Sequence, residues 1–477
     1  MMQYEFSWLL PMEVMLGSLN HAEVQACSIS TVPEELRGPK VEYDYNYKPK
    51  FISIGLLHKG SRRQLQLMEE LKWNYMCKFL NRQVTEDQNQ SSASRLRLVQ
   101  CGEDILKLDK VVRASYGGNI ELEPYEIAKI MILDGCFLLE FLLNLGDYMT
   151  MDGNAGGSNI DDVDPIFKDE EKLLFILNDI TMLENQIPFI VLKKLYRKVF
   201  PEYGIDITND HRVAKIVREA FDYPLVNTSG VAHILHLMHL STMDQNEQQT
   251  GKRAKRELFR CATKLRAVGI TIIGDKMKNR TQNQAKFKDV SNFDINFDKC
   301  GGNLVIPTLY VKETTEVKWR NLIAWEQNRI WVRCKYTSYA LFFNGLICCK
   351  HDIEFLTEKG VIVNESKKSN EDLLALFKTI AKGVERMDSS YSNICEDLNK
   401  YNNGKKVKKT LGGLVVMSWH LSRRSVEMLV YYWRNWLKIL LRDHIPTVWK
   451  LIGVMAAVIL LVCTILQTIY TMLGYFR

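Results

Sequence analysis

The chain has 477 residues, of which 46% are hydrophobic and 25% are charged, and its formal net charge is +7 at pH 7. This composition is that of an ordinary globular protein, and it excludes collagen-like, disordered and multi-span membrane proteins. A charge of +7 over this length is only mildly basic and does not by itself indicate a nucleic-acid partner.

Hydrophobic spacing predicts a mainly helical chain. Residues 127–145 are almost all apolar, with Asp134 and Glu140 as isolated acids, which is typical of a buried helix. Residues 171–183 have apolar residues at helical spacing, and Pro188 is expected to end or kink this helix. Further helices are predicted at 315–331, 336–356, 371–384 and 391–401.

One stretch is predicted to be extended. Phe293, Ile295 and Phe297 alternate with polar residues, and Gly301 with Gly302 supplies a turn. Apolar residues then alternate again at 304, 306, 309 and 311. The pattern predicts a small β-hairpin within an otherwise helical protein.

Polar stretches interrupt the helical pattern and are expected to be linkers; they lie near 85–94, 151–164, 241–256 and 402–409. The chain therefore divides into a poorly defined N-terminal segment at 1–31, a helical domain at 32–428, a basic amphipathic segment at 429–450 and a hydrophobic segment at 451–476. The basic run at 252–256 resembles a nuclear-import patch, although a solvated loop is the favoured interpretation.

The hydrophobic segment 451–476 contains no charged residue. As a helix its 26 residues would extend about 39 Å, enough to cross a bilayer with some tilt. Trp449 at one end and Tyr470 with Tyr475 at the other suit the two membrane interfaces. The predicted fold class is therefore mainly α, with a small β-hairpin and one C-terminal transmembrane helix; a buried core helix is the alternative.

Residues 405–450 contain ten Lys or Arg and two acids, and Arg477 adds one more positive charge, which leaves residues 1–404 with a net charge of −2. Within this stretch Arg434, Lys438 and Arg442 are spaced four apart and form one basic stripe. Beside a membrane span, such a helix is expected to bind anionic headgroups, so the predicted partner is a lipid membrane and not nucleic acid. A helix packed on the soluble domain is the alternative. The residues expected to contact the membrane are Arg434, Lys438, Arg442, Trp449, Lys450, Tyr470 and Tyr475.

The flanking charges predict which side of the membrane the large domain occupies. Four cations precede the hydrophobic segment and only Arg477 follows it, so the N-terminal domain is expected in the cytosol, with the plasma membrane as a working assumption. No signal peptide is evident at residues 1–10. The eleven cysteines form no CxxC pair, which indicates reduced, mostly buried thiols.

A search for catalytic motifs finds no Walker loop, GxGxxG, GxSxG, HExxH or kinase signature. His233, His236 and His239 are spaced three apart, so neighbouring pairs have the spacing to share a metal ion, but packing is favoured because only apolar residues separate them. We therefore predict no cofactor and infer no small-molecule substrate.

Isolated acids in apolar helices are the other candidates for chemistry. Asp134, Glu140, Glu184 and Glu326 have the character of acid–base groups, because burial raises a carboxyl pKa. Buried ion pairs or helix caps with a nearby cation, such as Arg320, are the favoured alternative because no nucleophile accompanies the acids.

The phrase VPEELRGPKVEYDYNYKPKFISIGLLHKG lies at 32–60, and the specific phrase LENQIPF lies at 183–189. Together these phrases resemble the plant family called domain of unknown function 247. Leu56 occupies a place where that family usually has proline, and LRDH at 441–444 lacks the second arginine of the usual phrase. Other matching phrases lie at 131–143, 262–270, 306–311, 320–327, 337–347 and 441–470.

The resemblance implies a membrane-associated plant protein with a C-terminal hydrophobic helix and no established enzymatic activity. Some grass members of the family act as pollen-side determinants of self-incompatibility, and the family supplies no catalytic residues to assign here. The leading hypothesis is a non-enzymatic module that recognises an unidentified protein partner. The alternative is an enzyme with an unrecognised carboxylate or histidine site.

Overall fold

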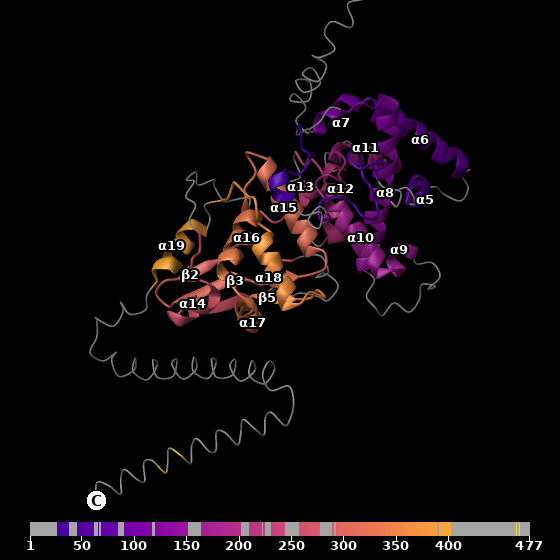
Figure 1. Cartoon of the computed structure of the whole chain (residues 1–477). Coiled ribbons are helices and arrows are strands. Elements are labelled where there is room, and N and C mark those ends of the chain that lie inside the picture. The colour runs from indigo at the N-terminus through magenta and orange to yellow at the C-terminus, as the bar shows by residue number, and fades with distance from the viewer. Residues whose placement is uncertain are drawn as a thin grey trace, which may run out of the picture. The chain divides into compact units, whose positions relative to one another are not determined.

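The computed structural model describes residues 26–401 with several gaps, and beyond residue 401 it describes only Thr464 and Gln467. Residues 1–401 form one compact unit, which is described here by itself. Its described part consists of helices and short strands (Figure 1). The gaps are 38–44, 62–64, 66–67, 84–89, 117–119, 151–163, 202–208, 222, 225–229, 244–256, 277–288, 291 and 389–390.

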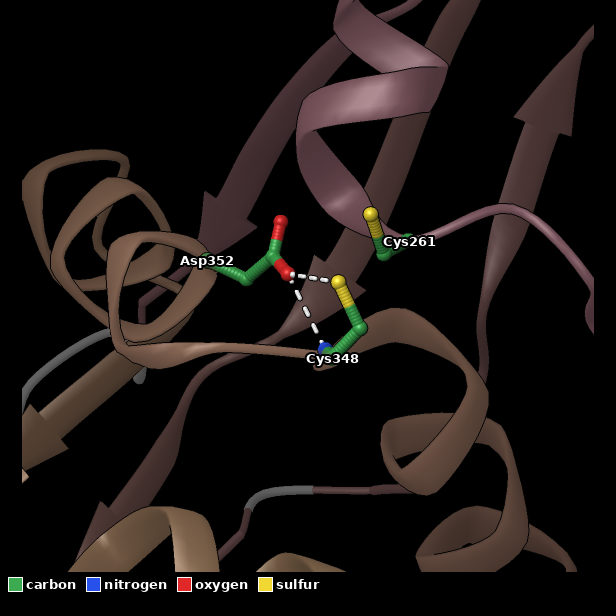
Figure 2. Close-up of side chains that lie close together, drawn as sticks. All are labelled: Cys261, Cys348 and Asp352. Carbon is green, nitrogen blue, oxygen red and sulfur yellow. Dashed lines mark hydrogen bonds between the residues drawn. The ribbon is translucent and has the colours of Figure 1, made fainter. Parts of the chain in front are cut away.

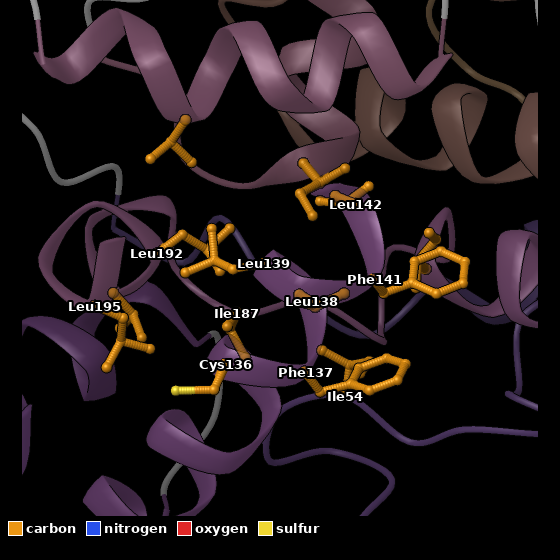
Figure 3. Packing of buried hydrophobic residues seen from close by; sticks show 14 of the residues in the cluster. Ile54, Cys136, Phe137, Leu138, Leu139, Phe141, Leu142, Ile187, Leu192 and Leu195 are labelled. Carbon is orange, nitrogen blue, oxygen red and sulfur yellow. The ribbon is translucent and has the colours of Figure 1, made fainter. Parts of the chain in front are cut away.

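The first half of this unit is helical and builds one apolar core. The longest helix, α8, lies at its centre, because α5, α6, α11 and α12 all pack against it. Figure 3 shows Leu139 of α8 on the side of the helix that faces Leu192, with Phe137 on the other side. The helices of this half are α2 (Glu34–Arg37), α5 (Glu69–Asn81), α6 (Gln90–Leu106), α7 (Asp109–Ser115), α8 (Pro124–Thr150), α9 (Pro165–Lys168), α10 (Glu170–Ile180), α11 (Phe189–Val199), α12 (Asn209–Phe221) and α13 (Ile234–Leu240). Helix α2 differs from the others because its buried Leu36 belongs to the second core.

The second half combines helices with two small sheets around a separate apolar core. Its helices are α14 (Ala262–Ala267), α15 (Thr315–Asn328), α16 (Lys335–Leu346), α17 (Lys350–Glu358), α18 (Asn370–Thr379) and α19 (Ser392–Lys400). Its strands are β1 (Thr271–Asp275), β2 (Asn296–Asp298), β3 (Asn303–Pro307), β4 (Leu309–Val311) and β5 (Ile362–Asn364).

The predicted β-hairpin is confirmed, and the structure extends it. Strands β2 and β3 pair antiparallel, with Phe297 opposite Leu304. Strand β1 adds to β3 in parallel, so that Ile272 faces Leu304. After Pro307 the chain leaves this sheet, and β4 pairs in parallel with β5, Leu309 opposite Ile362. The sequence pattern could not show these parallel partners, because they come from distant parts of the chain.

The predicted helix positions are confirmed, but two boundary predictions are wrong. Pro188 does not end the helix before it: α10 ends at Ile180, and Pro188 is the N-cap of α11. A proline at a helix start loses no helical hydrogen bond, which explains this placement. The predicted helix 336–356 is two helices, because α16 ends at Leu346 and α17 begins at Lys350. An Asp352 capping box starts the second helix.

The predicted fold class is also wrong in its transmembrane helix. Among the residues that the structure describes, no helix combines the length and apolar character needed to span a membrane. The longest, α8, has 27 residues but includes the charged residues Lys129, Asp134 and Glu140. The predicted span 451–476, apart from Thr464 and Gln467, lies outside the described residues. The fold class that the described residues support is mainly α with short β-strands.

The other predicted subdivisions have mixed outcomes. Helix α6 begins at Gln90 and so occupies part of the stretch 85–94 that we expected to be a linker. The stretch 402–409 and the amphipathic segment 429–450 lie outside the described residues, as do most of 151–164 and 241–256.

Residues 179–186, which comprise the last two residues of α10 and most of the connection to α11, hold the irregular segment 45–58 in place. The Asp179 carboxylate accepts hydrogen bonds from three consecutive backbone N–H groups at residues 50–52, at 2.7–3.0 Å. Asn185 accepts from the N–H of Ile54 at 2.6 Å and donates to the carbonyl of Ile52 at 3.0 Å. These side chains supply the partners that a strand or helix would otherwise give to a buried backbone.

The same segment also connects to the second core. The backbone N–H of Leu183 donates to Oδ1 of Asn321 on α15, at 2.9 Å. Gln186 accepts from the N–H of Leu235 on α13, at 3.3 Å. Residues 179–186 therefore join the N-terminal segment to helices of both halves.

Gly55 has to be glycine at the point where segment 45–58 meets residues 179–186. Its φ is +76°, and a Cβ there would lie 2.3 Å from the carbonyl oxygen of Gln186 and 2.5 Å from the Tyr116 hydroxyl. Gly60 has a similar φ of +70°, but a Cβ on Gly60 would meet no atom within 4 Å. A substitution at Gly60 therefore tests backbone strain alone, whereas a substitution at Gly55 adds a steric clash to that strain.

We expect Gly60→Ala to lower the free energy of unfolding by about 1–2 kcal/mol, the cost of a left-handed alanine. Gly55→Ala should cost at least about 2 kcal/mol more, because backbone atoms of residues 179–186 must move. Urea denaturation of both variants and the natural chain measures the difference. Equal losses in the two variants would contradict the close packing at Gly55.

Candidate functional site

An apolar hollow of about 420 Å³ lies between helices α5, α6 and α8. Its wall includes exposed aromatic side chains from two helices: Trp73 of α5 is 46% exposed and Tyr125 of α8 is 67% exposed. Large apolar side chains that are this exposed are unusual when they cluster in one concave part of the surface. The remaining lining residues are Met76, Leu98, Gly102, Leu106, Ala128, Lys129, Ile132 and Leu133.

Helix α6 supplies one wall because it carries two apolar stripes. Cys101 and Ile105, near its C-terminal end, are buried in the first core. Leu98 and Leu106 lie on the neighbouring stripe and line the hollow. Gly102 lies between these two on the same stripe, and a Cβ there would meet nothing within 4 Å. One apolar stripe of α6 is therefore buried in the core, and the neighbouring apolar stripe lines the hollow.

A second hollow of about 820 Å³ shares Trp73, Tyr125, Lys129 and Leu133 with the first, so the two form one continuous surface. This part is more polar; its other lining residues are Leu56, Leu57, Lys59, Glu69, Ile120, Glu121, Leu122, Glu126 and Ile130. Leu56, which departs from the family's usual proline, packs against the first core and lines this hollow. We call the two hollows together the α5–α6–α8 groove.

Charges surround the polar end of the groove. Lys59 lies 3.1 Å from Glu69, and this pair is partly exposed. The segment before α8 carries Glu121 and Glu123, both exposed, and Glu126 follows in the first turn of the helix. Lys129 lies one turn further along α8. Acids therefore outnumber cations along this edge of the groove.

His233 and His236 are buried against Trp325 of α15, with ring centroids 4.7 and 4.9 Å from it. His233 precedes α13, and its Nδ1 accepts a hydrogen bond from the His236 N–H at 3.2 Å. Its Nε2 lies 3.2 Å from the carbonyl oxygen of Ser28. The Nδ1 of His236 accepts from the N–H of Ala232 at 3.1 Å. Both imidazole rings therefore accept hydrogen bonds from backbone N–H groups around the start of α13 and pack against Trp325.

His239, the third histidine, pairs with a different group. Its Nε2 lies 3.0 Å from Oε1 of Glu326, a carboxylate that also accepts from the N–H groups of Tyr336 and Thr337 at 2.9 and 2.8 Å. These bonds join α13 to the ends of α15 and α16. The three imidazoles thus have separate partners, and the structure does not bring them together as one metal-ligand set within its described residues.

The other isolated acids also lie against cations. Asp134 is 2.7 Å from Nζ of Lys72, and both side chains are buried. Glu140 lies 2.6 Å from Nε of Arg82. Lys72 lies in α5 and Arg82 is the C-cap of that helix. Both ion pairs therefore connect α8 to α5 and stabilise the first core.

Three groups lie against the Glu184 carboxylate. The N–H of Val32 donates to it at 2.6 Å, Arg37 forms an ion pair with it, and His58 Nε2 lies 3.1 Å away. Burial raises the pKa of Glu184, but the nearby His58 imidazole, the hydrogen bond from Val32 and the charge of Arg37 outweigh burial and hold the pKa below its usual value.

The residues expected to contact a membrane, Arg434, Lys438, Arg442, Trp449, Lys450, Tyr470 and Tyr475, lie outside the described residues. The groove residues were not singled out in the sequence. The signal was the excess of apolar residues on α6, where Leu98 and Leu106 add a second stripe to the buried one.

The fold and the groove define a two-core helical protein with an exposed apolar surface. The chain belongs to DUF247, a family of plant proteins of unknown function, whose model matches residues 29–463. This match confirms the resemblance carried by phrases such as LENQIPF.

Two relatives come from Arabidopsis thaliana. The chain is 26% identical to UPF0481 protein At3g47200 over 485 residues, covering 96% of this chain and 88% of the relative. It is 27% identical to the putative UPF0481 protein At3g02645 over 187 residues, covering 38% of this chain and 30% of that relative. No solved structure matches the chain.

Burial lowers the pKa of His233 to about 3. Between pH 6.5 and 3 the unfolded chain therefore binds a proton that the folded chain excludes, so the free energy of unfolding falls as the pH is lowered through this window. We expect His233→Asn, which keeps an oxygen to cap α13, to reduce this slope by up to about 1.4 kcal/mol per pH unit.

Urea denaturation at several pH values measures the slope. His211→Asn, at an exposed histidine of α12, is the matched control and should leave the slope unchanged. Equal slopes for His233→Asn and the natural chain would contradict a neutral, buried His233.

Proposed function

We propose that this protein recognises a partner protein by binding an amphipathic helical segment in the α5–α6–α8 groove. The observation that carries the proposal is the continuous apolar surface formed by Trp73, Leu98, Leu106 and Tyr125. Family membership in proteins of unknown function leaves this activity open, so the proposal depends on the groove alone.

The shape and composition of the groove favour a helix as the ligand. Its walls come from three helices, and an amphipathic helix that lays its apolar face between helices is a recurring mode of peptide recognition. Trp73 and Tyr125 have the large, amphipathic rings that dominate binding energy at protein interfaces. Gly102 leaves room for a large apolar side chain of the partner.

Charge narrows the chemistry of the partner. Glu121 and Glu126 line the polar end together with Lys129, and the exposed Glu123 lies between the two acids in the chain. A partner helix with Leu, Phe or Trp at positions i, i+3 or i+4, and i+7, followed by Lys or Arg, would match both the apolar hollow and this acidic edge.

Binding is proposed in preference to catalysis because the candidate catalytic groups serve internal contacts. The four buried acids contact cations or imidazoles, and the three histidines cap α13 or pack on α15 and α16. Recognition of the kind that the resemblance implies for some grass members also requires an exposed surface for a partner.

A display library of amphipathic peptides, selected against the full chain, tests this proposal. We expect selection of helical peptides with the apolar and basic pattern given above. Leu98→Asp and Trp73→Ala should each weaken binding of a selected peptide about tenfold or more, because each removes an apolar anchor. Fluorescence anisotropy measures the dissociation constant.

Leu96→Asp is the matched control. Leu96 lies on the same helix and is 59% exposed, but it does not line the groove, so its variant should bind within about twofold of the natural chain. Equal losses for Leu96→Asp and Leu98→Asp would contradict the proposal. A dimer that Leu98→Asp converts to monomer would also contradict it, by assigning the groove to a second copy of the chain.

A further inference from the structure

Three chain segments of the second core bring two thiols and one carboxylate together (Figure 2). Cys261 is the N-cap of α14, Cys348 lies in the loop after α16, and Asp352 is in the first turn of α17. The ligand atoms of these residues all lie within 4.8 Å of one another, and Cys348 Sγ is 3.0 Å from Asp352 Oδ2. This cluster is separate from the groove and from the histidines.

The Asp352 carboxylate is held in a fixed orientation. The backbone N–H and the hydroxyl of Thr263 donate to Oδ1 at 2.9 and 2.8 Å. The N–H groups of Cys348 and Cys349 donate to Oδ2 at 3.0 and 3.2 Å. Hydrogen bonds of this kind orient metal-binding carboxylates in proteins.

Close backbone packing positions Cys261 beside Cys348. A Cβ on Gly345, near the end of α16, would lie 2.5 Å from the carbonyl oxygen of Leu258. Glycine thus lets the end of α16 approach the chain just before Cys261. Cys261 and Asp352 are buried, whereas Cys348 is exposed, so the cluster has two fixed interior donors and one donor at the surface.

A helix cap explains only part of this arrangement. Capping accounts for the bonds from Cys348 and Cys349 N–H groups to Asp352. It does not require a buried thiol from a third segment, Cys261, beside the same carboxylate. Two thiols and a carboxylate within 4.8 Å are a donor set that Zn²⁺ accepts.

We propose that Cys261, Cys348 and Asp352 bind Zn²⁺ and so clamp the starts of α14 and α17 to the end of α16. Cys349 lies next to this set, with its Sγ 3.5 Å from Asp352 Oδ2, and its thiol is the candidate fourth ligand. Binding releases the thiol protons, and the resulting thiolates and the carboxylate neutralise the charge of the ion. The site would stabilise the second core without taking part in the groove.

Cobalt(II) is the probe that tests the site, because a thiolate ligand gives Co²⁺ a charge-transfer absorption in the near ultraviolet. The reduced full chain should bind about one Co²⁺ with this absorption, and Zn²⁺ should displace it. Cys348→Ser and Cys261→Ser should each weaken Zn²⁺ binding about tenfold or more in competition with a chromogenic chelator. Cys348 is exposed, so its variant should fold even if the Cys261 variant does not.

Cys77→Ser and Cys300→Ser are matched controls, since both thiols are exposed and outside the cluster. They should leave the affinity and the absorption unchanged. Binding without thiolate absorption, or equal effects of Cys348→Ser and Cys300→Ser, would overturn the proposal. A Cys261–Cys348 disulfide in protein isolated with zinc present, found by mass spectrometry, would overturn it as well.

Discussion

The structure depends on how a buried segment without regular secondary structure finds partners for its backbone. Residues 45–58 form neither helix nor strand, yet Ile52 and Ile54 are buried in the first core. Unpaired backbone N–H groups there would each cost about 1–3 kcal/mol. Asp179, Asn185 and Asp134 accept hydrogen bonds from five of them, at residues 50, 51, 52, 54 and 55. Residues 179–186 and Asp134 of α8 are therefore the polar centre that holds segment 45–58 against the first core, and residues 183 and 186 connect it to α15 and α13.

This constraint explains why acids that look suitable for catalysis serve the fold. Asp134 accepts from Gly55 and pairs with Lys72, while Glu184 holds Val32 and Arg37. Glu326 does the same for the ends of α15 and α16. A buried charge without such a partner would strongly destabilise the fold, so burial of these acids requires the contacts that they make. Among the described residues, the groove lined by α6 and the thiols beside Asp352 are features that these contacts within the cores do not account for.

Much of the secondary structure could be predicted from local pattern. The apolar run that forms α8 and the alternation that forms β2 and β3 depend on neighbours in the chain, and both were predicted. The break after Leu346 was missed because the sequence there is apolar enough for one helix to continue. The new helix starts only because the Asp352 side chain accepts hydrogen bonds from backbone N–H groups that precede it. A long uncharged run predicted a membrane span at 451–476, but no described helix has that character. The groove was missed because a second apolar stripe is visible only when the first is known to be buried.

The sequence by itself determined that the chain is mainly helical, where most helices lie and which family it belongs to, because helical periodicity and family phrases are local properties. Only the tertiary structure decided the roles of the polar residues. A carboxylate in an apolar helix has the same sequence signature whether it meets a cation, a backbone N–H or a substrate. Lys72 is 62 residues from Asp134, and Cys261 is 87 residues from Cys348, so their meeting depends on long-range packing that periodicity does not encode.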